Sequence, residues 1–134
     1  MEYVSPSSYY KLNLPDGWVF SENGDVVNFY DRVGGVGALQ ISSYLIDKGT
    51  NIDIASELTQ ILINEIGLGE KDIFTKIYVQ NDVAYFTLLI DNRYWEYYLL
   101  FKNRKLLFIT YNCSQTDRYA EKNVIDEIVQ SISL

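Results

Sequence analysis

The sequence lacks histidine, has one cysteine and contains no long apolar run. Without histidine the commonest general base and metal ligand are missing, so Ser–His–Asp and Cys–His catalytic arrangements are excluded. Cys113 cannot form an intramolecular disulfide, and we interpret it as a small buried apolar side chain. No leader-like start and no run near the ~20 apolar residues of a membrane span are visible, which predicts a cytoplasmic protein. A chain whose leader had been removed would look the same.

Basic side chains are also few, with 11 Lys and Arg against 18 Asp and Glu and a net charge of −7. A nucleic-acid interface needs a basic stripe, and the densest basic group here, at residues 102–105, falls in a predicted turn. We therefore predict no nucleic-acid partner and no binding to an anionic membrane. The acidic balance is compatible with a basic protein partner, but simple solubility is the interpretation that it favours.

Cofactor signatures are missing as well. The glycine-rich stretch at 34–37 is a predicted turn, because no Lys or Ser/Thr follows at phosphate-loop spacing and a strand comes next. Asp47, Asp53 and Asp72 lack the spacing of a calcium loop. We predict no cofactor, no metal site and no catalytic residue.

The length and the abundant tyrosine indicate the fold class. With 134 residues, the chain is expected to form a single domain, 1–134, in which residues 1–8 are a loose tail. Aromatic residues make up 15% of the chain, with 12 Tyr, which favours sheet. Short strands, separated by turns, are predicted at residues 9–14, 18–20, 26–30 and 38–46.

Two stretches have helical periodicity instead. Residues 52–66 carry apolar side chains on one face, with Asn51 or Asp53 as a cap and Gly67 at the end. Residues 117–131 form the second predicted helix, capped by Thr116 or Asp117. Its inward stripe is Val124, Ile125, Ile128, Val129 and Ile132.

Residues 73–113 are predicted to form four strands joined by three tight turns. Two-residue turns at 81–82 and 92–93 place apolar residues opposite apolar residues. For the third turn we prefer a three-residue loop at 103–105 over a two-residue turn. The longer loop keeps one face apolar and avoids like charges directly opposed.

With these turns, one face becomes an apolar wall that we predict to carry both helices. The wall comprises Ile77, Val79, Phe86, Leu88, Ile90, Trp95, Tyr97, Leu99, Phe101, Leu107, Ile109 and Tyr111. The opposite face is mixed and comprises Phe74, Tyr78, Tyr85, Leu89, Tyr94, Glu96, Tyr98, Leu100 and Phe108. It is too apolar for plain solvent surface. We expect another part of the chain, a partner, or a second copy in a homodimer to cover it.

The order of elements resembles that of the Mog1/PsbP/DcrB-like superfamily. The likeness lies in Leu14-Pro15-Asp16-Gly17-Trp18, in residues 35–42 of the early hairpin and in residues 125–132 near the end. It implies an α+β fold of the α/β/α sandwich type: short strands and a four-stranded meander in one antiparallel sheet, with two main helices. Members of the superfamily include a nuclear transport GTPase-binding factor and a photosystem assembly protein. Because these functions differ, the resemblance transfers no function and no site.

A candidate binding site lies on the mixed face, at Tyr85, Tyr94, Glu96 and Tyr98. A carboxylate beside tyrosines can bind a sugar or a cationic group, and tyrosine is frequent at binding hot spots. The simpler alternatives are a solvated Glu96 and tyrosines that only pack the sheet. Paired carboxylates of a hydrolase would require Asp91 or Asp82 beside Glu96, and no spacing favours either.

The sequence therefore favours a non-catalytic protein-interaction module. One specific form is an immunity or antitoxin-type inhibitor, since such proteins are often small, acidic and cytoplasmic. The alternative is a small-ligand or carbohydrate-binding protein, and a hydrolase is the weakest of the three.

Overall fold

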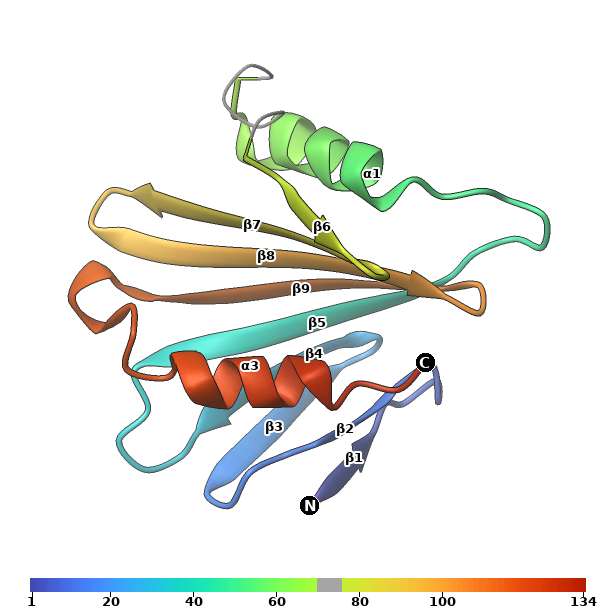
Figure 1. The fold of residues 1–134 in the computed structure, drawn as a ribbon. Helices are drawn as coiled ribbons and strands as arrows, with labels where there is room; N and C mark the ends of the chain where they lie inside the picture. Colours follow the sequence, from blue (N-terminus) through green and yellow to red (C-terminus); the bar gives the residue numbers. More distant parts are fainter. Residues whose placement is uncertain (70–75) are drawn as a thin grey trace.

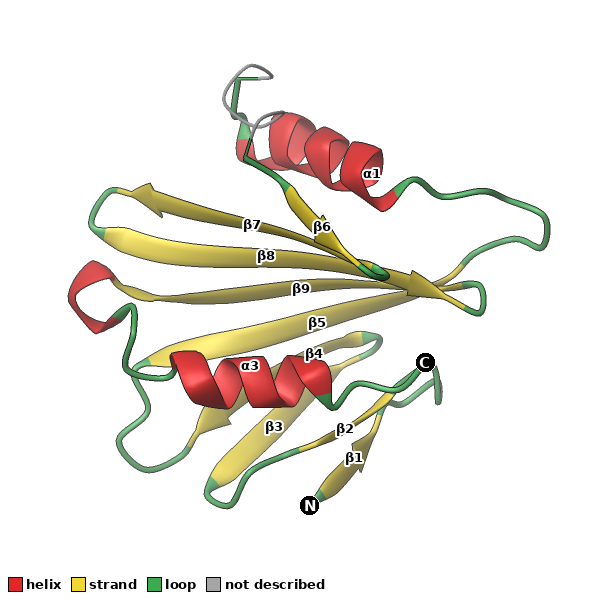
Figure 2. Ribbon diagram, in the orientation of Figure 1, coloured by secondary structure: helices red, strands yellow, loops and turns green. Residues whose placement is uncertain are grey.

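The part of the chain that the structure describes forms an α/β/α sandwich around a seven-stranded antiparallel sheet (Figures 1 and 2). The structure, a computed structural model, describes residues 1–69 and 76–134. Phe74 and the predicted start of the meander at residue 73 lie outside the described residues. The strand order is β3-β4-β5-β9-β8-β7-β6. Their bounds are Trp18–Asn23 for β3, Val26–Asp31 for β4, Gly37–Leu45 for β5, Tyr78–Gln80 for β6, Val83–Ile90 for β7, Arg93–Lys102 for β8 and Lys105–Ser114 for β9.

The first residues are not a loose tail, so that prediction was wrong. Glu2–Val4 forms strand β1 and pairs with β2, Lys11–Asn13, in a separate two-stranded sheet. Tyr3 is only 3% exposed and donates its hydroxyl to Glu22 Oε2 at 2.7 Å. Its ring packs on Phe20 and Phe29, so burial of an aromatic side chain holds this hairpin against the sheet.

The first predicted helix is present. Helix α1 spans Ile54–Ile61 and continues through a π-helical turn, η1, at Leu62–Ile66. The Asp53 carboxylate accepts hydrogen bonds from the backbone amides of Ala55 and Ser56, so the helix begins two residues later than predicted. It ends at Gly67, whose φ of 82° is the left-handed conformation that glycine adopts without strain.

The last helix begins later than predicted. A short 3₁₀ helix, η2, occupies Gln115–Asp117, and helix α3 runs over Lys122–Gln130 without a side-chain cap. Thr116 and Asp117 therefore do not cap α3, because that part of the chain makes a turn of its own. The predicted inward stripe is confirmed: Ile125, Ile128 and Val129 are buried, and Val124 and Ile132 pack partly against them.

The hairpin turns decide which side chains share a face. The β6–β7 register is as predicted, with Val79 opposite Ala84. The β7–β8 turn lies at 91–92, not 92–93, so the pairing shifts by two residues and every face is kept. The β8–β9 turn has two residues, Asn103 and Arg104, both with positive φ. The predicted three-residue loop was wrong, and the shift by one residue turns all of β9 over.

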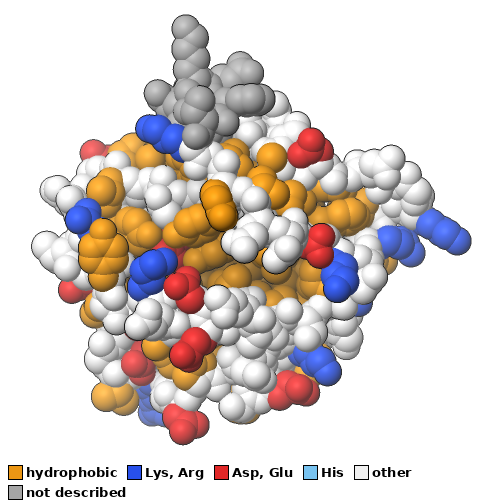
Figure 3. Space-filling view, in the orientation of Figure 1, with side chains coloured by type: hydrophobic (Ala, Val, Ile, Leu, Met, Phe, Trp, Pro, Cys, Tyr) orange, Lys and Arg blue, Asp and Glu red, His pale blue; other side chains and the backbone are white. Residues whose placement is uncertain are grey.

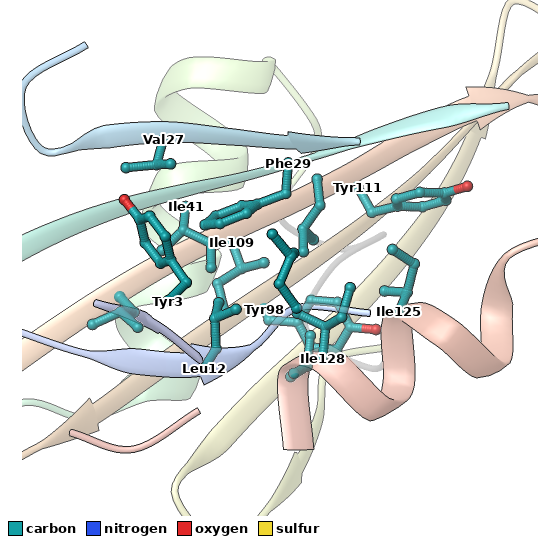
Figure 4. Close-up of a cluster of buried hydrophobic side chains, with 14 of the residues drawn as sticks. Tyr3, Leu12, Val27, Phe29, Ile41, Tyr98, Ile109, Tyr111, Ile125 and Ile128 are labelled. Carbon is teal, nitrogen blue, oxygen red and sulfur yellow. The ribbon is translucent and has the colours of Figure 1, made fainter. Parts of the chain in front are cut away.

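Each helix consequently covers its own face of the sheet, and the prediction of one wall under both helices was wrong. Leu107, Ile109 and Tyr111 join the face of Glu96, which α3 and the β1–β2 hairpin cover (Figures 1 and 4). The side chains drawn in Figure 4 fill the space between α3, β2 and the sheet. Helix α1 covers the other face over β7 and β8, where Leu58 and Leu62 are fully buried. Most of the mixed face is therefore covered by the chain itself.

Candidate binding site

The four predicted site residues come together around one carboxylate. Tyr94, Glu96 and Tyr98 occupy every second position of β8 and so share one face, and Tyr85 lies opposite Tyr98 on β7. Tyr94 donates its hydroxyl to Glu96 Oε2 at 2.8 Å, Tyr98 donates to Oε1 at 3.0 Å, and Tyr85 donates to Oε2 at 3.3 Å. We call these four residues the Glu96 cluster. Its geometry follows from strand alternation, which puts residues two apart on one face.

Glu96 is not the solvated strand residue of the simpler alternative. Its side chain is 1% exposed, and it lies under α3 in the sandwich. Among the described residues the ion pair found is Lys122–Asp126, so no Lys or Arg of that part pairs with Glu96. The three phenol hydroxyls therefore solvate the carboxylate in place of water, as a buried charge requires.

The tyrosines of the Glu96 cluster are held in their neutral, donating form. Burial and the Glu96 carboxylate raise the pKa of Tyr85 to about 12. The same causes raise the pKa values of Tyr94 and Tyr98 further. A phenolate beside the carboxylate would place two negative charges together in an apolar interior, which is unfavourable.

A second acid–phenol pair lies near the start of α3. Tyr111 donates its hydroxyl to Glu121 Oε1 at 2.8 Å, and both side chains are buried. Cys113 lies on the same face of β9, and burial raises the pKa of its thiol. A thiol with a raised pKa is a weak nucleophile, in keeping with its interpretation as a packing residue.

A cleft opens beside the Glu96 cluster, between α3 and the strands β6, β7 and β8. Its volume is about 840 Å³, and apolar atoms lie at its bottom between polar and charged side chains (Figure 3). The aliphatic part of the lining comprises Val83, Leu100, Val129, Ile132 and Leu134. Tyr85 and Tyr98 belong both to the lining and to the Glu96 cluster, so the cleft reaches the cluster through two aromatic rings.

The rim of the cleft carries residues other than the four predicted site residues. Tyr78, which is 61% exposed, comes from β6, and Lys102 comes from the end of β8. Lys122 and Asp126 come from α3 and form an ion pair at 3.5 Å. Their i, i+4 spacing was visible in the sequence, but their position over Tyr85 and Tyr98 depends on the β9 register.

The weaker candidates are not assembled into a site. Asp82 and Asp91 lie in the turns at opposite ends of β7, and the buried Glu96 is closed to a substrate. In residues 1–69 and 76–134, no group of three potential metal-ligating side chains is close enough to hold an ion. Within the same residues, no helix is long and apolar enough to cross a membrane.

Comparison with known proteins gives structural neighbours only. No family model matches the chain, and no curated protein matches its sequence. Among solved structures, PsbP (CyanoP) from Synechocystis sp. PCC 6803 aligns with a TM-score of 0.69 at 13% identity, over 100% of this chain and 91% of that one. The Ran-binding protein Mog1p of Saccharomyces cerevisiae aligns with a TM-score of 0.60 at 10% identity, over 99% and 94% of the two chains. The chain has a Mog1/PsbP-like fold.

A third similar structure comes from Bacteroides thetaiotaomicron VPI-5482. It aligns with a TM-score of 0.63 at 14% identity over 98% of this chain. The chain spans about half the length of that protein, 47%. At such identities the likeness establishes the fold and no activity.

Proposed function

We propose that this protein is a non-catalytic protein-interaction module and that the cleft between α3 and β6–β8 receives its partner. The cleft carries the proposal, because it has an apolar floor, a polar and charged rim and an exposed aromatic ring, Tyr78, at its edge. Protein interfaces have this composition, and tyrosine is enriched at their centres. The Ran-binding protein Mog1p, which has the same fold, binds a protein.

The finer form of the proposal is an immunity or antitoxin-type inhibitor acting in the cytoplasm. The net charge of −7 supports it, since an acidic inhibitor associates rapidly with a basic target. In that case the gene next to this one encodes a protein that arrests growth, and co-expression of this chain restores growth. Growth arrest that co-expression leaves unchanged would contradict the inhibitor form while leaving the module itself open to test.

The module is tested by photo-crosslinking in the native host. A photoreactive amino acid at position 78 should cross-link a partner of constant mass, whereas the same group at position 44 should not. Tyr78 and Tyr44 are both exposed strand tyrosines, but Tyr44 lies on the face that α1 covers only in part. The purified partner should bind this chain with 1:1 stoichiometry.

Matched variants then assign the binding to the cleft. Tyr78→Ala should weaken binding of the purified partner by about tenfold or more, the loss that a hot-spot aromatic causes. Tyr44→Ala should leave binding unchanged. Equal effects of the two variants, or no stoichiometric partner at all, would contradict the proposal.

A small-ligand or carbohydrate-binding function is the second candidate. It rests on the tilted ring pair of Tyr85 and Tyr98, whose centroids are 4.8 Å apart, on the wall of a cleft large enough for a small ligand. This function is tested by titrating a panel of oligosaccharides into the protein. Binding should shift the NMR signals of the residues that line the cleft.

A further inference from the structure

The Glu96 cluster places negative charge directly behind the wall of the cleft. Tyr85 and Tyr98 line the cleft with their rings and donate their hydroxyls to Glu96. A phenol that donates to a carboxylate becomes richer in electrons, which makes its ring a better acceptor for a cation. Because Glu96 is buried, water screens its charge weakly on the side of the cleft.

A second carboxylate acts on the same two rings from α3. Asp126 lines the cleft, and its charge contributes to the raised pKa values of Tyr85 and Tyr98. The two rings thus lie near two carboxylates, that of Glu96 in the sheet and that of Asp126 in the helix. A cation above these rings would be attracted by both carboxylates.

The basic residues of the cleft, Lys102 and Lys122, only weakly oppose the attraction of a cation by Glu96 and Asp126. Lys122 is engaged with Asp126 in an i, i+4 pair whose side chains are 41% and 39% exposed. Such exposed pairs contribute little, so an incoming cation can replace Lys122 at small cost. Lys102 is exposed and lies at the end of β8, where its flexible side chain can turn to solvent.

We propose that the cleft receives a lysine or arginine side chain of the partner protein, with the cation over the rings of Tyr85 and Tyr98. The aliphatic stem of that side chain would pack on Leu100 and Val129, and the charged head would lie between Glu96 and Asp126. The inference rests on the proposed function and adds the chemistry of the partner. The cation contacts the rings and Asp126, while Glu96 acts through its hydrogen bonds to the phenols.

The direct test uses a minimal probe with the full chain. N-acetyl-arginine N-methylamide should shift the backbone amide signals of β6, β7 and the last turn of α3 in NMR titrations. The citrulline derivative, which has the same shape without the charge, should bind about fivefold more weakly, the upper end of the range for one exposed charge interaction. Equal binding of the two probes would overturn the inference.

Charge variants give the sign of the recognised group. Asp126→Asn should weaken binding of the arginine probe about threefold, and Lys102→Gln should tighten it by a similar factor, since each changes one exposed charge. Glu127→Gln makes the same charge change as Asp126→Asn on the exposed side of α3 and should have no effect. Weaker binding of the arginine probe by Lys102→Gln would show that Lys102 does not repel the bound group, and it would overturn the inference.

The partner experiment separates this inference from the proposed function. A purified partner that loses affinity with Tyr78→Ala and with Asp126→Asn supports both. A partner that loses affinity with Tyr78→Ala but not with Asp126→Asn upholds the module and overturns the cationic site. An arginine probe that binds while no protein partner is recovered overturns the module and shows the site to be one for small cations.

Discussion

Glu96 and Tyr111 lie directly opposite one another on β8 and β9, yet each makes its hydrogen bonds with other residues. Glu96 accepts from the phenols of β7 and β8, whereas Tyr111 donates to Glu121 near the start of α3. Two acid–phenol groups thus lie side by side under one helix. Each group satisfies a buried carboxylate with phenol hydroxyls, and no Lys or Arg of residues 1–69 and 76–134 forms an ion pair with either carboxylate. Tyrosine therefore has a structural use here beyond packing.

Replacing Glu96 by glutamine should destabilise the protein by about 2–3 kcal/mol. The substitution keeps the volume, but the new amide group points a donor at phenols that are themselves donors, and at least one buried hydroxyl loses its acceptor. The free energy of unfolding in urea is the measurement. Glu22→Gln is the matched control, because exposed Glu22 accepts from one phenol, Tyr3, and should lose less than about 1 kcal/mol. Equal losses would contradict a structural role for the cluster.

Stability should decrease above pH 10. Burial and Glu96 raise the pKa of Tyr85 from 10.0 to about 12 in the folded chain, so the unfolded chain releases this proton first. The contribution of the Tyr85 proton to the free energy of unfolding is complete below pH 10. It is lost as the pH rises through 12, because the folded state then holds more protons than the unfolded state. Each such tyrosine adds a slope of up to about 1.4 kcal/mol per pH unit. Tyr94 and Tyr98 act in the same direction.

The loss of stability at alkaline pH is measured as the free energy of unfolding in urea between pH 9 and pH 11.5. Tyr85→Phe should lower the slope in this range, because it removes one of the titrating groups. Tyr44→Phe, at an exposed tyrosine outside the cluster, should keep the wild-type slope. Identical slopes for wild type and Tyr85→Phe would show that Tyr85 titrates alike in both states.

Gly37→Ala should destabilise the protein by about 1–3 kcal/mol through overpacking. A Cβ atom at this position would lie 2.5 Å from the Tyr111 hydroxyl and 2.6 Å from the Asn112 carbonyl oxygen. Tyr111 would have to move, and its bond to Glu121 would weaken. Urea unfolding of the Gly37→Ala and Tyr111→Leu single and double variants is the measurement. The alanine should cost less in the Tyr111→Leu background, and an unchanged cost would show that the ring is not in the way.

The sequence pattern predicted the elements well, because period-2 and period-3.6 patterns survive errors in register. Helix α1, the stripe of α3 and strand β4 follow directly from such patterns. The turn at Asn103-Arg104 was missed, because it pairs Lys102 with Lys105 and Trp95 with Asn112, which a rule of apolar opposite apolar rejects. The repulsion between Lys102 and Lys105 acts at an open end of the sheet, where water and salt screen it.

The candidate site was predicted only in part, because alternation along a strand survives a register error whereas the choice of the buried face does not. Tyr85, Tyr94, Glu96 and Tyr98 share a face by alternation along two paired strands, and the shift of β7 by two residues kept that face. Asp126 and Lys122 come from a helix whose position depended on which face of β9 is buried. No local sequence pattern predicts which face of β9 is buried under α3, since the turn before β9 determines it.

The two-residue turn can be tested by placing isoleucine at either end of it. Asn103 has a φ of 54°, so Asn103→Ile forces a β-branched residue into a left-handed conformation and should cost about 1–2 kcal/mol. Lys105 is the first residue of β9, so Lys105→Ile should be neutral or slightly stabilising, because it favours the strand and removes a like-charge pair. In a three-residue loop Lys105 would occupy the position that prefers glycine, and the isoleucine there would be costly instead. Unfolding free energies of the two variants decide between the registers, and with them the face of the sheet on which Tyr111 meets α3.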